Sequence, residues 1–242
     1  AVEGFGRASL DQRAIAQDGE MVSEAEIVAA QQGSTPTGQP RAAVGFSFGL
    51  IAAALVQYGL LPDLQPELMR AASLMRELQG GFQPEVPVAM NRAKRDAGQL
   101  VGRWVTVFGA DHLAPVARRW KSQINELAKA WAQVEILPEA DHNTLAGLLN
   151  PEEVLMHTLA LFLTAPGIHP RNQVRIDLTR QMFLEQGIGT DLFQARGETR
   201  LAQMWSALHY GDYLAYYLAL AYGIDPSPVE MLEGLKHMLN HS

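Results

Sequence analysis

The sequence predicts an α/β fold, a three-layer αβα sandwich around a parallel β-sheet, with a helical segment before it. From about residue 100, four short β-prone segments alternate with longer segments of helical periodicity. Two of these strands are nearly continuous apolar runs, as in strands that helices cover on both faces. The chain has 242 residues, enough for a large core without disulfides. We therefore expect a parallel sheet with helices on both sides.

The chain divides into three regions by composition. Residues 1–40 are polar and rich in small residues, and they end in a Gly/Ser/Thr/Pro stretch that is typical of a loop. Residues 41–96 are predicted to form a helical connecting segment, and residues 97–242 the α/β domain. Helical patterns before the sheet cover residues 40–61, 64–79 and 87–101.

The elements of the α/β domain follow in regular order. Strands are expected at residues 103–110, 133–139, 155–166 and 189–197. Helices are expected at residues 112–131, 143–149, 171–188, 199–224 and 227–240. In open parallel sheets, ligands usually bind at the carboxyl ends of the strands, so we look for function there first.

Composition excludes several classes of function. The chain has no cysteine, which rules out disulfides and cysteine metal sites and fits a reducing, cytoplasmic location. The net charge is -7, and basic residues form no long run, so no nucleic-acid partner is predicted.

One stretch resembles a membrane span in length. Residues 44–61 carry no charge over 18 positions, the lower limit for crossing a bilayer. They also contain three glycines, Ser47 and Gln57, and the rest of the chain has no second such segment. We therefore predict a helix of the core or of a dimer interface, and no membrane partner.

Two side chains near the middle of the chain are candidates for chemistry. Glu126 flanks the apolar stripe of the helix at 112–131, and His142 follows the next strand. The simpler interpretation of Glu126 is a solvated carboxylate paired with Lys129, and that of His142 is a loop histidine bonded to nearby backbone. Residue patterns alone leave both interpretations open.

Three separated motifs carry a resemblance to a known family. The segment "RRWKSQINELAKAWAQVEILPEADHNTLAG" is preceded by "GQPRAAVGFSFGLI" and followed by "GDYLAYYLALAYGIDPSPVEMLEGLK". In this order they resemble the carboxyl-terminal portion of the bifunctional phosphoglucose/phosphomannose isomerases, which have the SIS fold. The resemblance covers about residues 36–242.

The resemblance implies an activity and a set of site residues. It implies interconversion of glucose 6-phosphate or mannose 6-phosphate with fructose 6-phosphate through a cis-enediol. Glu126 would transfer the proton between C1 and C2, and His142 would open the sugar ring. Arg41 would stabilise the intermediate, and Lys236 would reach the ring or its hydroxyls. The resemblance further implies no metal and no organic cofactor, a phosphorylated sugar as ligand, and a homodimer that builds shared sites.

The sequence also departs from the family pattern. The family's amino-terminal SIS domain, with its "SxSGxT" phosphate loop, is largely missing, because only 40 residues precede Arg41. Leu127 replaces the asparagine after the glutamate, and Asp141 precedes His142. An alternative prediction is therefore a catalytically silent SIS-type protein that binds phosphosugars or only dimerises.

Overall fold

The computed structural model describes residues 41 and 43–241, so the predicted segment 1–40 lies outside the described residues. The chain forms two compact units, Ala1–Glu77 and Leu78–Ser242. The second unit begins at Leu78 and includes the last residues of the predicted connecting segment 41–96. The boundaries at 40/41 and 96/97 remain predictions.

The described part of the first unit is helical, as the sequence predicts. It contains α2 (Val44–Gln57) and most of α3 (Gln65–Gln79). The helix predicted at 40–61 begins at Val44 and ends at Gln57. A turn with Gly59 in the left-handed region closes its carboxyl end. Across residues 41 and 43–241, no helix has the length and apolar character needed to cross a membrane.

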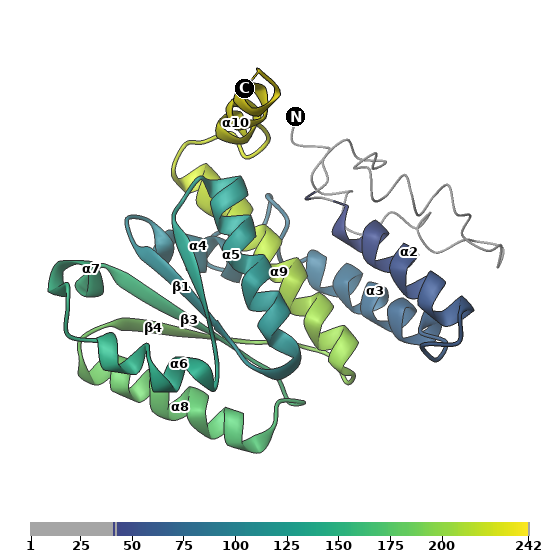
Figure 1. Ribbon diagram of the computed structural model, residues 1–242, viewed down its shortest axis with the longest axis horizontal. Coiled ribbons are helices and arrows are strands. Elements are labelled where there is room, and N and C mark those ends of the chain that lie inside the picture. The colour runs from purple at the N-terminus through teal and green to yellow at the C-terminus, as the bar shows by residue number, and fades with distance from the viewer. Residues whose placement is uncertain (1–40, 42, 242) are drawn as a thin grey trace. The chain divides into compact units, whose positions relative to one another are not determined.

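The second unit is built on a parallel sheet (Figure 1). Its strands, in the spatial order β2-β1-β3-β4, are β1 (Trp104–Gly109), β2 (Ala132–Ile136), β3 (Thr158–Thr164) and β4 (Gly189–Gln194). Every neighbouring pair is parallel. All seven residues of β3 are buried, which matches its apolar sequence. The predicted parallel sheet is confirmed.

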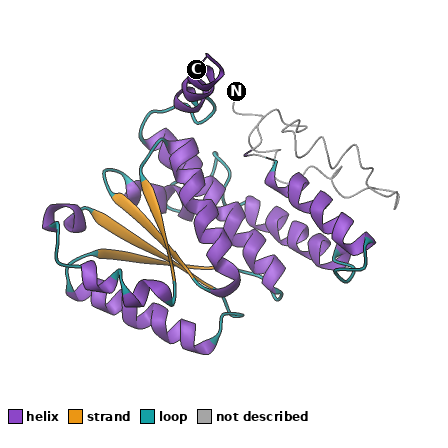
Figure 2. Ribbon diagram, viewed as in Figure 1, coloured by secondary structure: helices purple, strands orange, loops and turns teal. Residues whose placement is uncertain are grey.

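Helices cover both faces of this sheet (Figure 2). The helices of the second unit are α4 (Arg92–Leu100), α5 (Ala114–Ala128), α6 (Glu139–His142), α7 (Glu152–Met156), α8 (Pro170–Glu185), α9 (Arg200–Ala221) and α10 (Glu230–His241). Helices α5 and α9 lie on one face, and α6 and α8 lie on the other. The three-layer αβα arrangement is confirmed.

Several boundaries differ from those expected. Helix α4 starts at Arg92 rather than at residue 87, because the Asn91 side chain caps it by accepting from the Lys94 N–H at 3.2 Å. Residues 143–149 form turns and a 3-10 helix, while His142 ends the short helix α6 instead of lying in a loop. Helix α7 is an element that the periodicity did not indicate.

The core of the second unit lies between the sheet and the α5–α9 layer. The Trp120 side chain is buried, and its indole N–H donates to the carbonyl oxygen of Ala207 on α9 at 2.8 Å. A β-carbon at Gly211 would collide with this indole ring, so glycine permits the close approach of α9 to α5. On the face that α8 covers, the stacked rings of Phe108 and Phe162 pack against Phe183 of α8 and continue the core.

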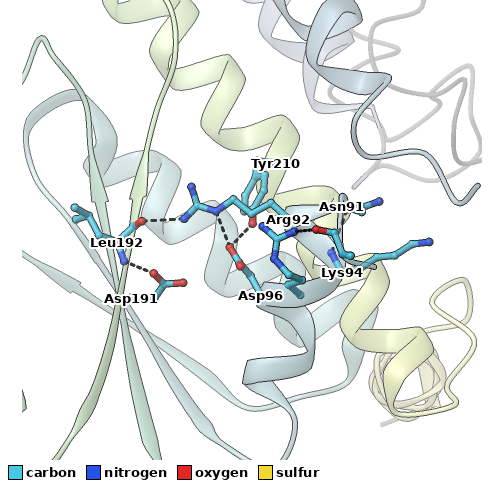
Figure 3. A network of polar contacts seen from close by, with 9 residues as sticks. Asn91, Arg92, Lys94, Asp96, Asp191, Leu192 and Tyr210 are labelled. Carbon is cyan, nitrogen blue, oxygen red and sulfur yellow. Dashed lines mark hydrogen bonds and ion pairs between the residues drawn. The ribbon is translucent and has the colours of Figure 1, made fainter. Parts of the chain in front are cut away.

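A polar network fastens α4 to α9 and to the edge strand β4 (Figure 3). The Arg92 guanidinium pairs with the Asp96 carboxylate at 3.0 Å and donates to the Leu192 carbonyl oxygen at 3.0 Å. The buried Tyr210 hydroxyl donates to the same carboxylate, and burial raises the pKa of this tyrosine. The Leu192 N–H donates to the Asp191 carboxylate at 2.7 Å. The charged side chains of α4 therefore connect this helix to both α9 and β4.

Candidate functional site

A cavity of about 770 Å³ lies at the amino end of β2. One wall is the last two turns of α5, from Lys121 to Lys129, and the floor is the start of β2. The opposite wall is the loop between α9 and α10 together with the first turn of α10. Glu126, the predicted proton-transferring residue, lines this cavity.

The position of Glu126 follows from the amphipathic character of α5. The residues on both sides of it in the apolar stripe, Ile124 and Leu127, are fully buried against the sheet. Glu126 lies about 100° from Leu127 around the helix axis, so its side chain leaves the core and stays half-buried at the surface. The carboxylate can therefore meet a ligand while its helix remains fixed by the core.

The end of α5 is held by side chains of its own last turn. Lys129 has a left-handed backbone, with φ of 53°, and its N–H donates to the Ile124 carbonyl oxygen. The Asn125 side chain donates to the Ala130 carbonyl oxygen at 2.7 Å. The Lys129 ammonium donates to the Glu126 carbonyl oxygen at 2.7 Å. The helix therefore ends at Ala128, three residues before the predicted end at 131.

The opposite wall of the cavity begins with a tight turn. The Asp225 carboxylate accepts from the Ser227 N–H at 2.8 Å, and this backbone hydrogen bond lowers the pKa of Asp225. Asp225 lines the cavity with Glu126, Lys121 and Lys129. The cavity is therefore lined by three carboxylates, those of Glu126, Asp225 and Glu230, and by two ammonium groups.

Apart from Asn125 and Gln133, the remaining lining is apolar. The Trp131 side chain is 63% exposed and lies beside Trp104, with 5.7 Å between ring centroids. Met231 and Leu232 contribute from the first turn of α10. An open apolar surface of this kind around charged groups is typical of a surface that a ligand or another protein segment covers.

His142 lies at the other edge of the sheet. It ends α6, directly after the carboxyl end of β2, and its side chain is exposed. Strand β2 separates it from the cavity, because Ala132 and Gln133 at the start of this strand line the cavity. Five residues of strand span about 16 Å. One copy of the chain therefore does not bring Glu126 and His142 together.

Of the two predicted cations, Lys236 lies outside the cavity lining. Lys236 is exposed on α10, one helical turn beyond Leu232, the last α10 residue that lines the cavity. Arg41 belongs to the first compact unit and is half-buried there. Their roles remain predictions.

Polar contacts fasten the loops at the carboxyl edge of the sheet to one another. Asp141, beside His142, accepts from the Thr179 hydroxyl at 2.7 Å and pairs with Arg175 at 3.5 Å, both on α8. Asp111, after β1, accepts from the His169 N–H and the Asn172 side chain, each at 2.8 Å. The carboxylates at this edge therefore bind neighbouring protein groups.

Two titratable groups on α9, the buried His209 and the half-buried Asp212, are not among the residues that line the cavity. The His209 side chain is 2% exposed, and burial lowers its pKa to about 4. Burial raises the pKa of Asp212 to about 6, although the Gln123 side chain donates a hydrogen bond to this carboxylate. Within the described residues, no group of three or more His, Cys, Asp or Glu side chains could hold a metal ion.

Several cavity residues were not selected from the sequence. Lys121, Asn125 and Lys129 lie in the motif that carries the family resemblance, so their proximity to Glu126 was a usable signal. Trp131 and Asp225 had no such signal, because their place in the cavity depends on how α10 folds back beside α5.

Comparison with solved structures gives the class of the fold. The chain is similar to a glucose-6-phosphate isomerase like protein from Thermus thermophilus, with a TM-score of 0.62 and 25% sequence identity. The match covers 75% of this chain and 60% of that one. The two proteins therefore share a fold, a parallel β-sheet covered by helices on both faces.

Comparison with family models then gives the family. Residues 89–239 match the bacterial phospho-glucose isomerase C-terminal SIS domain, and the chain belongs to this family. It is 33% identical to a bifunctional phosphoglucose/phosphomannose isomerase from Caldicellulosiruptor bescii, over 84% of this chain and 61% of the relative. It is 29% identical to a protein of the same name from Aquifex aeolicus, over 98% of this chain and 70% of the relative. The resemblance stated from the sequence is confirmed.

The matched part is shorter than these relatives. The chain spans about three fifths of the length of the Caldicellulosiruptor bescii protein and of the Thermus thermophilus structure. What the whole relatives do is therefore carried over only as a proposal.

Proposed function

We propose that this chain is the part of a sugar-phosphate isomerase that carries the proton-transferring carboxylate. The reaction would interconvert glucose 6-phosphate or mannose 6-phosphate with fructose 6-phosphate. The observation that carries the proposal is that Glu126 lines a cavity of about 770 Å³ at a rigid helix end. The names of the relatives support the substrate class.

The chemistry needs one base that reaches two adjacent carbons. In the open-chain aldose, a carboxylate takes the proton from C2, which gives a cis-enediol, and returns it to C1 to give the ketose. Glu126 would do this from the end of α5. Lys121 lines the same cavity, and a cation near the oxygens of the enediol would stabilise its developing negative charge.

Ring opening needs a second group, and we assign it to His142 of another copy of the chain. His142 and Glu126 lie at opposite edges of the sheet within one copy, so a complete site requires a partner. A two-fold dimer would give two equivalent sites, each with Glu126 from one copy and His142 from the other. Arg41 and Lys236 would complete these sites.

Hydrogen exchange at the substrate tests the proposed reaction. Fructose 6-phosphate is incubated with the protein in D₂O, and the products are followed by NMR. An enediol mechanism incorporates deuterium at C2 of the aldose 6-phosphate that forms, because the carboxylate exchanges its proton with solvent. If neither deuterium incorporation nor aldose 6-phosphate appears, the chain does not catalyse this reaction by itself.

A mixture of two inactive variants tests the shared site. Glu126→Gln and His142→Ala are unfolded, mixed and refolded together. With sites shared between copies, half of the dimers are mixed and each holds one intact site, so about a quarter of the wild-type activity returns. With sites inside one copy, mixing restores nothing.

The separation of Glu126 from His142 also favours the alternative function. A chain without a complete site within one copy could bind a phosphosugar, or only dimerise, without turnover. Titration of glucose 6-phosphate into the protein by calorimetry separates these outcomes. Binding without deuterium incorporation would indicate a silent phosphosugar-binding protein, and the absence of both would indicate an assembly module.

A further inference from the structure

The lysine that follows α5 makes an unusual set of contacts. Lys129 has a φ of 53° and a ψ of 24°, in the left-handed region where glycine or asparagine usually ends a helix. A residue with a β-carbon is less favourable in this conformation. Helix termination alone would therefore favour glycine, and the lysine side chain needs another explanation.

The ammonium group of Lys129 supplies one. It donates to the Glu126 carbonyl oxygen at 2.7 Å and lies 3.4 Å from that of Leu127. These oxygens belong to the last turn of α5, where carbonyl groups lack helical partners and a positive charge is favoured. The same ammonium donates to the Pro226 carbonyl oxygen at 3.2 Å, which lies 97 residues further along the chain.

Pro226 connects this contact to the other wall of the cavity. It is buried in the loop between α9 and α10, beside Ile224 and Asp225, which line the cavity. Helix α10 has no buried residue, and its Met231 is 86% exposed. Core packing within the described chain therefore does little to fix the position of α10. The position of α10 depends mainly on the loop that precedes it.

We propose that Lys129 is a positioning residue that joins the two walls of the Glu126 cavity. Its ammonium holds the end of α5 and the α9–α10 loop at a fixed separation, and this separation sets the width of the cavity opening. For its effect on turnover, the inference rests on the proposed function. Its effect on the cavity wall does not depend on any activity.

Hydrogen–deuterium exchange tests the effect on the wall. Lys129→Gly removes the ammonium but suits the left-handed backbone, so it separates the two possible roles of this residue. We expect at least about tenfold faster amide exchange at residues 224–232 in Lys129→Gly and Lys129→Met, with no change in β3, because a local opening leaves core strands protected. Lys129→Arg should retain most of the protection, since guanidinium can donate to the same carbonyl oxygens.

Lys121→Met is the matched control. It removes the same charge from the same helix and the same cavity, and the exchange at residues 224–232 should stay as in the wild type. Wild-type exchange in Lys129→Gly would overturn the proposal, because only the backbone conformation would then matter. Equal acceleration in β3 and in the loop would also overturn it, since Lys129 would then act as a general stabiliser.

Turnover provides the second readout. In an active preparation, Lys129→Met should lower kcat by about tenfold and Lys129→Arg should restore most of it, as expected for a group that holds a base in position. Normal kcat in Lys129→Met, together with a loosened loop, would overturn the positioning role while leaving the isomerase assignment intact. If the wild-type protein shows no turnover, the proposed function fails, and the exchange experiment still decides whether Lys129 joins the walls.

Discussion

The two edges of the parallel sheet differ in what their side chains do. At the carboxyl edge, Asp111 and Asp141 are bound by groups on α8 and its amino end. At the amino edge, Glu126 and the exposed Trp131 line an open cavity. Ligands of open parallel sheets usually bind at the carboxyl edge. Here the cavity that Glu126 lines is at the opposite edge, so the general rule for parallel sheets does not point to it.

Replacement of the cavity carboxylate should have the largest effect. Glu126→Gln keeps the shape of the side chain and removes its basicity, so kcat for isomerisation should fall by about 10²- to 10⁴-fold. Steady-state kinetics of an active preparation measures this loss. The unfolding midpoint should stay within error, because the side chain is half-buried at the surface. Retention of more than a tenth of the activity would contradict the role of Glu126.

A buried histidine on α9, which packs across the sheet, should make the stability of the fold sensitive to acid. Helix α9 carries His209, whose pKa is about 4 in the folded protein, against about 6.5 in an unfolded chain. Unfolding therefore takes up a proton below pH 6.5, and stability is lost as the pH falls towards 4. The loss attributable to His209 approaches about 3 kcal/mol at pH 4, with about 2 kcal/mol lost by pH 5.

Urea unfolding at pH 7 and pH 5 measures this loss. Asp212 on the same helix titrates in this range with the opposite sign, so the wild type has to be compared with His209→Gln. The variant should be less stable at pH 7, because it alters a packed site. Between pH 7 and pH 5, the free energy of unfolding of the variant should fall by about 2 kcal/mol less than that of the wild type. Identical pH dependence in both proteins would show that His209 does not cause the effect.

The carboxyl edge should respond to loss of its polar contacts. Asp111 accepts two hydrogen bonds and has a φ of 49°, so Asp111→Ala removes both contacts and leaves alanine in a left-handed conformation. We expect a loss of about 1–2 kcal/mol in the free energy of unfolding. Asp111→Asn should cost less, because asparagine tolerates this conformation. Equal stability of the alanine variant and the wild type would remove the contrast between the two edges.

The amino edge should tolerate the loss of its most exposed aromatic ring. Trp131→Ala is expected to change the free energy of unfolding by no more than about 0.5 kcal/mol, because the side chain is 63% exposed. Urea unfolding measures this change. A loss above about 1 kcal/mol would show that the ring contact with Trp104 is structural and that this surface is not kept for a ligand or partner.

Much of the fold could be predicted because its signals are local. Period and composition place α5 and β3 correctly, and the continuous apolar sequence of β3 predicts its burial on both faces. The helix ends were less predictable. The end of α5 depends on Lys129 and Asn125, whose side chains bond to backbone in a pattern that periodicity does not report.

The site was predictable only in part. Glu126 was selected through the family resemblance; it lines the cavity, and its role in proton transfer stays a prediction. The separation of Glu126 from His142 follows from the predicted parallel topology, because the crossover helix α5 ends at the amino edge of the sheet and His142 follows the carboxyl end of β2. Trp131 and Asp225 depend on a fold-back of the chain after α9, a long-range contact that leaves no periodic signal.

The network at the middle of β4 has a consequence for association between molecules. An edge strand presents unpaired N–H and C=O groups that can recruit a strand from another molecule. At Leu192, both outward groups are occupied, the N–H by the Asp191 carboxylate and the C=O by the Arg92 guanidinium. A further strand would have to displace these two side chains in order to extend the sheet at Leu192. The middle of β4 is thereby protected against pairing with a strand of another molecule.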